Sequence, residues 1–168
     1  KHNGYITAES KVRAGTTFYI YLPACHKDVM SAERQKDNIV TGKGKVLLLD
    51  YEDTVRSVTG KILHRLGYNV EFARNGMEAI EIYKKAKENG IPFDSVIMDL
   101  TIPGGIGGKE AIQELVLFDP EIKAIVSSGY TTDSIVSDYR KYGFSAFIAK
   151  PYKLSELSEI LHDVINTG

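Results

Sequence analysis

The sequence lacks the features that would point to a secreted, membrane-spanning or polyanion-binding protein. It has one cysteine, Cys25, so no disulfide can form within the chain, and we expect a reducing compartment, the cytoplasm. No apolar run approaches the length that spans a bilayer, and no signal peptide is visible. The formal net charge is only −1, which gives no strong electrostatic field for binding nucleic acid.

What the sequence does contain is the composition of a soluble globular protein, with 43% hydrophobic and 26% charged residues. A length of 168 residues suits one ordinary domain and an appendage. Residues 1–43 hold seven Lys and Arg against four Asp and Glu, so the remainder is mildly acidic. We therefore expect a main body that does not bind nucleic acid, preceded by a distinct segment. Because the first residue is Lys1 rather than Met, we expect a piece of a longer protein.

The leading segment predicts a strand pair followed by a linker. Residues 4–10 and 16–22 are rich in β-branched and aromatic residues that roughly alternate with polar ones, and a turn separates them. A lone hairpin is marginal in water, so this pair should pack on another surface or be partly disordered. Residues 24–44 are polar and read as a linker, with a helical turn over residues 29–36 as one option.

From residue 45 onward, short apolar runs alternate with helical patterns. The predicted strands are 46–49, 69–73, 93–99, 122–128 and 145–149, and the predicted helices are 54–66, 76–88, 108–118, 132–142 and 154–165. Five βα units in a row predict an α/β protein with a doubly wound, flavodoxin-like parallel sheet and helices on both faces. In the common strand order 2-1-3-4-5, ligands bind beyond the carboxyl ends of strands one and three.

Charged and hydroxyl residues stand at the ends of these predicted strands. Asp50 follows the first strand, Asp99 ends the third, Ser128 ends the fourth, and Lys150 follows the fifth. Two carboxylates at one sheet edge repel each other, and Mg²⁺ relieves this repulsion because it prefers hard oxygen ligands. A carboxylate can also attack phosphorus, while a metal and a lysine ammonium stabilise the transferred group. The pattern therefore predicts a site for phosphoryl transfer.

The strand-end residues are accompanied by an Asp-x-x-x-Pro-Gly run that begins at Asp99 and by a Lys-Pro pair at Lys150. In this set of motifs, residues 45–166 resemble the receiver domains of bacterial two-component signalling. The resemblance implies that Asp99 accepts a phosphoryl group from a phosphohistidine and that Lys150 binds that group. It implies that Asp50, Asp99 and the main-chain carbonyl of Thr101 hold Mg²⁺. It also implies a cis peptide between Lys150 and Pro151, and that the domain catalyses its own phosphorylation and dephosphorylation.

The resemblance further implies a switch that alters contacts with a protein partner. Ser128 is the switch hydroxyl, preferred to Ser127 because 22 residues separate it from Lys150, as the family spacing suggests. Phe147 is the switch aromatic, and its alternative is ordinary core packing. Phosphorylation would draw Ser128 inward and let Phe147 turn inward. The identity of the partner and a homodimer are left open.

One position departs from the family pattern. The family usually has two adjacent acids after the first strand, whereas here Tyr51 follows Asp50. A phenol has a pKa of about 10 and is a poor Mg²⁺ ligand near neutral pH. We therefore predict weakened Mg²⁺ binding, with Glu52 as a further candidate ligand or a water in its place. Asp53 is better interpreted as the N-cap of the first helix than as a ligand.

The leading segment has a resemblance of its own. Residues 4–6 and 15–23 look like the last two strands of a histidine-kinase ATP-binding domain. This implies a kinase end at 1–23, a linker at 24–44 and a receiver at 45–168, the order of a hybrid sensor histidine kinase, whose parent protein can be membrane-associated. The nucleotide-binding boxes of that family would lie upstream, so we expect no ATP binding of the kinase kind here.

Two alternatives remain open. A phosphorylation-independent interaction module with the same fold is favoured by Tyr51 alone. A flavin- or nucleotide-binding protein of the same fold would leave the paired acids and the strand-end lysine unexplained. The glycine-rich run 104–108 lacks the Lys-Ser/Thr pair of a nucleotide loop, so it is better interpreted as a flexible loop that enters a helix.

Overall fold

The structure is a computed structural model that describes residues 3–23, 39–100, 102, 105–129 and 138–167. The chain divides into two compact units, Lys1–Lys36 and Asp37–Gly168, and each is described here by itself. The first unit contains an antiparallel hairpin of β1 (Tyr5–Lys11) and β2 (Gly15–Tyr21), close to the predicted strand pair. Within the described ranges, no helix is both long and apolar enough to cross a membrane.

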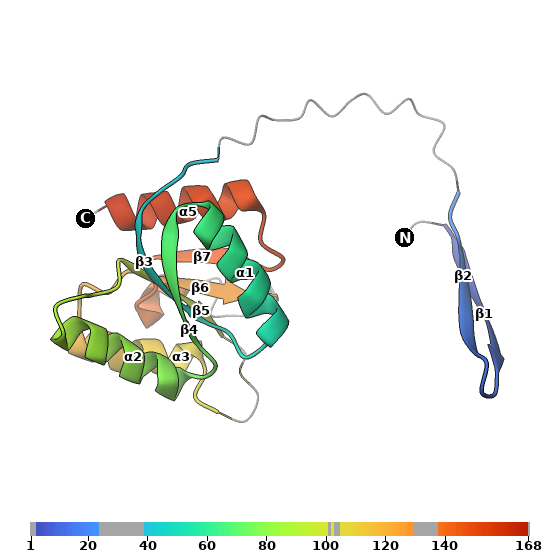
Figure 1. Ribbon diagram of the computed structural model, residues 1–168, viewed down its shortest axis with the longest axis horizontal. Helices are drawn as coiled ribbons and strands as arrows, with labels where there is room; N and C mark the ends of the chain where they lie inside the picture. Colours follow the sequence, from blue (N-terminus) through green and yellow to red (C-terminus); the bar gives the residue numbers. More distant parts are fainter. Residues whose placement is uncertain (1–2, 24–38, 101, 103–104, 130–137, 168) are drawn as a thin grey trace. The chain divides into compact units, whose positions relative to one another are not determined.

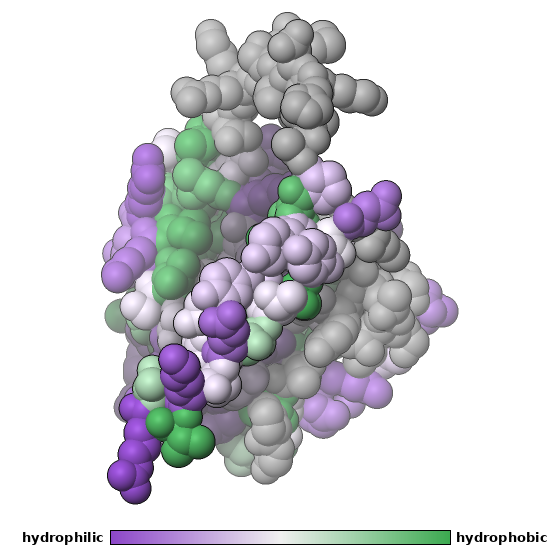
Figure 2. Space-filling view, turned by 90° about the vertical axis from the view of Figure 1, so that its right-hand side faces the viewer, coloured by the Kyte–Doolittle hydropathy of each residue, from purple (hydrophilic) through white to green (hydrophobic). Residues whose placement is uncertain are grey.

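The hairpin has one apolar and one more polar face. Because side chains alternate along a strand and Ile6 pairs with Ile20, these two residues share a face with Ala8 and Phe18. The opposite face carries tyrosine and threonine side chains, and every residue of both strands is exposed. Apolar and hydrophilic residues thus both reach the molecular surface, as Figure 2 also shows. The hairpin lacks a core of its own.

The second unit is built on a five-stranded parallel sheet in the order β4-β3-β5-β6-β7. Its strands are β3 (Gly44–Leu49), β4 (Tyr68–Ala73), β5 (Ser95–Asp99), β6 (Ala124–Ser128) and β7 (Ala146–Ala149). This arrangement confirms the predicted 2-1-3-4-5 order of a flavodoxin-like fold. Strands β5 and β6 are buried along their whole length, which explains why their sequences are continuous apolar runs rather than alternating ones.

Helices cover both faces of the sheet (Figure 1). α1 (Asp53–Arg65) and α5 (Leu154–Asn166) pack on one face, where they share a core cluster with strand residues. α2 (Gly76–Glu88) and α3 (Gly108–Phe118) pack on the other face around a second cluster. The bounds of α2 and α3 match the predicted ones. The carboxyl ends of β3, β5, β6 and β7 therefore lie along one edge of a well-packed sheet.

The end of the predicted linker is attached to the second unit. The Val40 amide donates a hydrogen bond to the Ser158 hydroxyl at 3.3 Å, and the Gly42 amide donates to the Leu66 carbonyl at 2.8 Å. A Cβ at Gly42 would lie 2.1 Å from the Tyr68 hydroxyl, so this close approach requires glycine. The described residues 39–43 thus form part of the domain body. The helical turn suggested at 29–36 lies outside the described residues.

Two local predictions are wrong in the described part of the chain. The N-cap of α1 is Glu52 rather than Asp53, because the carboxylate of Asp53, the first helical residue, pairs with the Arg56 side chain instead. The described end of the predicted helix 132–142 is a 3₁₀ turn, η1 (Tyr139–Tyr142), rather than an α-helix. It ends at Gly143, whose φ of 95° breaks the helical path. Residues 130–137 lie outside the described ranges.

Candidate functional site

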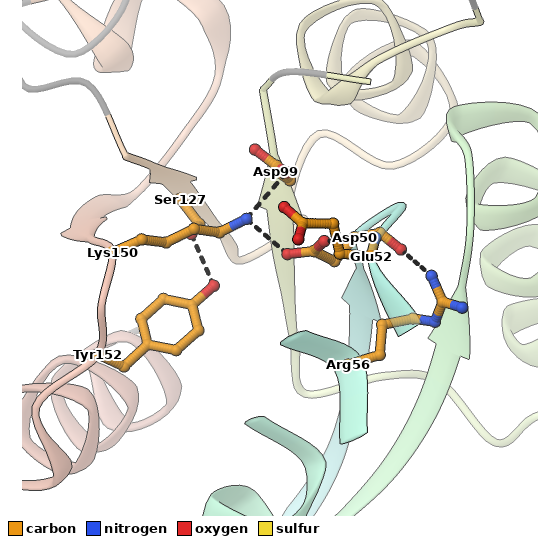
Figure 3. A network of polar contacts seen from close by, with 7 residues as sticks. All are labelled: Asp50, Glu52, Arg56, Asp99, Ser127, Lys150 and Tyr152. Atoms are coloured by element: carbon orange, nitrogen blue, oxygen red, sulfur yellow. Dashed lines mark hydrogen bonds and ion pairs between the residues drawn. The ribbon is translucent and has the colours of Figure 1, made fainter. Parts of the chain in front are cut away.

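Asp50, Asp99 and Lys150 converge at the carboxyl edge of the sheet (Figure 3). The Lys150 Nζ atom lies 2.5 Å from Asp50 Oδ2 and 2.9 Å from Asp99 Oδ2. The Asp50 side chain is fully buried, and that of Asp99 is 6% exposed. These residues follow or end β3, β5 and β7, so the structure brings together the three side chains that the strand-end pattern predicted in one site.

The charges of this cluster do not balance. Burial lowers the pKa of Lys150, but the hydrogen bonds that it donates to Asp50 and Asp99 outweigh this effect and leave its pKa above the ordinary value. Lys150 is therefore a cation at neutral pH. One buried ammonium shared by two buried carboxylates leaves an excess of negative charge, and that excess favours an added cation.

A buried arginine holds the loop that carries Asp50. The Arg56 guanidinium donates to the Asp50 carbonyl and pairs with the Asp53 carboxylate, while Asp50 Oδ1 accepts a 2.9 Å hydrogen bond from the Glu52 amide. Arg56 is only 7% exposed, and we did not predict its role. The sequence did contain a signal for this pairing, because Asp53 stands three residues before Arg56 and so lies on the same side of the helix.

The buried face of α1 carries Arg56, Thr59, Gly60 and Leu63. Val55 and Val58, two of the apolar residues of α1, lie outside this face, and Val58 is 52% exposed. Both valines instead border an apolar surface groove of about 420 Å³ that reaches Lys150. The residues that line this groove are Thr54, Val55, Val58, Thr59, Ile62, Lys150, Pro151 and Tyr152. The apolar spacing of α1 thus identified a helix correctly but not its buried side.

Tyr51 lies at the mouth of the site and is 43% exposed. The negative charge of Glu52 raises the pKa of Tyr51, with smaller contributions from burial and from the charges of Asp99 and Asp50. The phenol therefore stays protonated. In the part of the chain that the structure describes, no three His, Cys, Asp or Glu residues gather as a metal-binding group, so Glu52 does not complete such a group with the two aspartates. Thr101 lies outside the described residues.

The two serines at the end of β6 face opposite sides of the sheet. Alternation puts Ser128 on the face of Val126, and Phe147 pairs in register with Val126 and packs against the same core cluster. The predicted switch residues Ser128 and Phe147 thus share one sheet face. Ser127 faces the other way, where its hydroxyl lies 2.7 Å from that of Tyr152.

The segment after β7 connects these features. The Lys150 amide donates to the Ser128 carbonyl at 2.9 Å, and the Lys150-Pro151 peptide is cis, as predicted. Burial raises the pKa of Tyr152 to about 12, so its hydroxyl keeps its proton. The Ser127–Tyr152 pair was not predicted, because a tyrosine two residues after a lysine does not indicate which residue its hydroxyl contacts.

Comparisons with known proteins point to one family. The sequence profile of the response regulator receiver domain matches residues 46–162. Sensor kinase CckA of Brucella abortus is 32% identical over 171 residues, which cover 96% of this chain and 18% of CckA. Chemotaxis protein CheY of Thermotoga maritima is 36% identical over 121 residues, which cover 71% of this chain and 96% of CheY. The chain thus spans less than a fifth of CckA and matches nearly all of CheY.

Solved structures show the same fold. A receiver domain protein from Clostridium thermocellum is similar with a TM-score of 0.63 at 25% identity, covering 73% of this chain and 94% of its own. The receiver domain of a sensor histidine kinase from Pseudomonas aeruginosa is similar with a TM-score of 0.65 at 22% identity, covering 74% of this chain and 98% of its own. That crystal structure has a magnesium ion coordinated in its active-site cleft.

Proposed function

The chain belongs to the response regulator receiver domain family of two-component signalling, and from this premise we propose that Asp99 accepts a phosphoryl group from a phosphohistidine. The observation that carries the proposal is the pairing of Lys150 with both Asp50 and Asp99. A carboxylate nucleophile, a second acid and a cation thereby stand together at the sheet edge where ligands of this fold bind. Phosphorylation would alter the contacts of the domain with a protein partner.

In the proposed phosphoryl transfer, Asp99 is the residue of this chain that forms a covalent bond. One oxygen of Asp99 attacks the phosphorus and forms a P–O bond, while the P–N bond to the donor imidazole breaks. The electron pair of that bond goes to the imidazole nitrogen, which takes a proton from solvent. The Lys150 ammonium pairs with a phosphoryl oxygen and offsets its charge. Water later hydrolyses the acyl phosphate, which releases phosphate and restores the Asp99 carboxylate.

Mg²⁺ fits the residues of this site. Asp50 and Asp99 would hold it with the main-chain carbonyl of Thr101, and waters would fill the remaining positions. The fit rests on two buried carboxylates that share a single lysine, because these supply hard oxygen donors and excess negative charge. When bound, Mg²⁺ supplies positive charge beside the transferred group. We propose that Tyr51 weakens this binding, with a water or a reoriented Glu52 in place of a second adjacent acid.

The proposed switch uses the face of the sheet that Ser128 and Phe147 share. A phosphoryl group on Asp99 would draw the Ser128 hydroxyl towards it as a hydrogen-bond donor. The space behind Ser128 would then admit the half-buried ring of Phe147. Movement at these two positions would reshape the surface formed by β6, β7 and the segment between them. A local charge event would thus bias a two-state element.

We further propose that the chain comes from a hybrid sensor histidine kinase, with a kinase end at 1–23 and a receiver at 45–168. The linker between them would end in residues 39–43, which are bonded to the receiver. Two relatives named as kinases, CckA and the peroxide stress-activated kinase Mak1 of Schizosaccharomyces pombe, align over 96% of this chain, whereas CheY aligns over 71%. The kinase relatives therefore share residues beyond the receiver. The apolar face of the hairpin, with Ile6, Phe18 and Ile20, is a surface that a complete ATP-binding domain would cover.

Tyr51 favours a second candidate function, a receiver-like interaction module that is not phosphorylated. In this module, Tyr51 in place of the second acid would abolish Mg²⁺ binding and phosphorylation, while the fold would be retained. The paired acids and Lys150 argue for the first function, because a module without chemistry has no need to bury two repelling carboxylates.

Beryllofluoride, a phosphoryl mimic, separates the two candidates when added with Mg²⁺ to the 168-residue chain. The first function predicts saturable binding, followed by amide NMR shifts near Asp99, and its loss in Asp99→Asn. Asp119→Asn is the matched control, because Asp119 is a buried, ion-paired aspartate between other elements. Binding that survives Asp99→Asn, or no binding by the wild-type chain, would overturn the phosphoacceptor proposal.

A further inference from the structure

A hydroxyl pair lies directly behind the proposed site. Tyr152 stands two residues after Lys150, and its hydroxyl contacts the hydroxyl of Ser127 at 2.7 Å, one residue before Ser128 (Figure 3). Ser127 is fully buried and pairs in register with Asp99 on β5. The pair thus touches the segments that carry all three residues proposed to contact the phosphoryl group.

Main-chain hydrogen bonds show what the hydroxyl pair reinforces. The Ser127 carbonyl accepts a 3.2 Å bond from the Leu100 amide, next to Asp99, and the Ser128 carbonyl accepts the 2.9 Å bond from the Lys150 amide. The end of β6 is therefore linked to β5 on one side and to the start of the β7–α5 loop on the other. Tyr152 adds a side-chain bond across the second of these links.

The polar pair stands out against its surroundings. Ser127 lies on the sheet face where Ile125, Ile148 and Leu157 form an apolar core cluster, and Tyr152 packs against that cluster. An apolar pair would fill this place without the need to match a buried serine hydroxyl with a half-buried tyrosine hydroxyl. A buried hydrogen bond also defines one geometry where apolar contacts allow several. The site beside it requires one geometry, because Lys150 must contact two carboxylates.

We propose that Tyr152 is a positioning residue for phosphoryl binding at Asp99. Through its hydroxyl bond to Ser127 it holds the end of β6 against the β7–α5 loop, and so keeps Lys150 and Ser128 at the distances that the phosphoryl oxygens require. The inference rests on the proposed function, since it concerns the same site. In this role Tyr152 acts on the site through its hydrogen bond to Ser127.

The test compares beryllofluoride affinity, at fixed Mg²⁺, in Tyr152→Phe, Ser127→Ala and the double variant. Tyr152→Phe keeps the ring in its place and removes only the hydroxyl, and Ser127→Ala removes the partner. Each single variant should bind about three- to tenfold more weakly than the wild type, the effect expected for one hydrogen bond. The double variant should be no weaker than the singles, because all three lack the same bond.

Tyr83→Phe is the matched control for a merely structural loss. The Tyr83 hydroxyl makes a buried 2.7 Å hydrogen bond to Asp119, away from the site, so this variant should lose stability and keep wild-type affinity. Tyr152→Phe with wild-type affinity, or losses that add up in the double variant, would overturn the inference and leave the proposed function standing. A wild-type chain that does not bind beryllofluoride would remove the proposed function and the inference with it.

Discussion

Two clusters in the second unit pair buried aspartates with lysine and differ in their ratio of acids to lysine. At the carboxyl edge of the sheet, one lysine, Lys150, pairs with two acids, Asp50 and Asp99. Between α2 and α3, one acid, Asp119, pairs with Lys87 and accepts a 2.7 Å hydrogen bond from Tyr83. The first cluster sets two carboxylates against one ammonium, whereas the second sets one carboxylate against one ammonium.

The difference distinguishes the proposed phosphoryl-transfer site from a structural cluster. Burial disfavours the charged form of Asp119, but the hydrogen bonds from Lys87 and Tyr83 outweigh it and lower its pKa, so the fold gains from this charge. Asp50 and Asp99 repel each other and both contact Lys150, so their burial costs stability, and an added cation would offset that cost. The Asp119 cluster connects α2 to the end of α3, and the Asp50–Asp99 cluster is the proposed site for a cation.

Removing the lysine from each cluster should have the largest contrasting effect. Lys150→Met should slow the phosphorylation of Asp99 by acetyl phosphate about 100-fold, the usual cost of losing one preorganised cation or donor at a reacting group. Lys87→Met should keep the wild-type rate. Intact mass against time measures both rates. Equal rates in the two variants would mean that the Lys150 cluster is structural like the other.

Removing an acid from each cluster should affect stability in a contrasting way. Asp119→Ala should lower the free energy of unfolding by about 2 kcal/mol, because it leaves the buried Tyr83 hydroxyl without its acceptor. Asp99→Ala should change it by less than about 1 kcal/mol, because Lys150 keeps Asp50 and one repulsion disappears. Urea unfolding without Mg²⁺ gives both values. A larger loss in Asp99→Ala would contradict the unbalanced-charge account.

Adding an acid should sharpen the difference further. Tyr51→Asp should tighten Mg²⁺ binding about tenfold, because it supplies a hard oxygen ligand beside Asp50. Leu117→Asp on α3 is the control, since it adds an acid at an 87% exposed position away from the site and should leave the affinity unchanged. Titration calorimetry compares them. Unchanged affinity in Tyr51→Asp would remove the explanation for weakened binding.

The pH dependence of stability should differ in sign between the clusters. The folded pKa of Asp119 is lowered, so its contribution is present above the unfolded pKa and is lost as pH falls through the folded value, below about pH 4. In Asp119→Asn the free energy of unfolding should therefore fall less steeply as pH is lowered through this range, which urea unfolding at several pH values measures. The folded pKa of Lys150 is raised, so its contribution is present at neutral pH and is lost only in alkali. An unchanged acid limb in Asp119→Asn would contradict the assignment.

Prediction succeeded where a local pattern decides the structure. The bounds of α2 follow from an apolar spacing that begins after Asn75, whose side chain caps the helix by accepting a bond from the Glu78 amide. It failed where packing chooses between alternatives. The apolar spacing of α1 predicted a helix but did not choose its buried side. The fold leaves Val58 exposed and buries Arg56, whose guanidinium pairs with the Asp50 carbonyl and the Asp53 carboxylate.

The sequence by itself determined the succession of strand and helix segments and the acids and lysine at the strand ends, because apolar runs and helical spacing are local properties of the chain. The sheet order was expected from the common order of doubly wound folds, and the strand pairing confirmed it. Only the tertiary structure decided that Lys150 donates hydrogen bonds to both Asp50 and Asp99. Lys150 and Asp50 are 100 residues apart in the sequence. The tertiary structure alone decided that Tyr152 bonds to Ser127. A polar side chain reaches its partner only after the whole sheet has formed, so such pairings depend on every element between them.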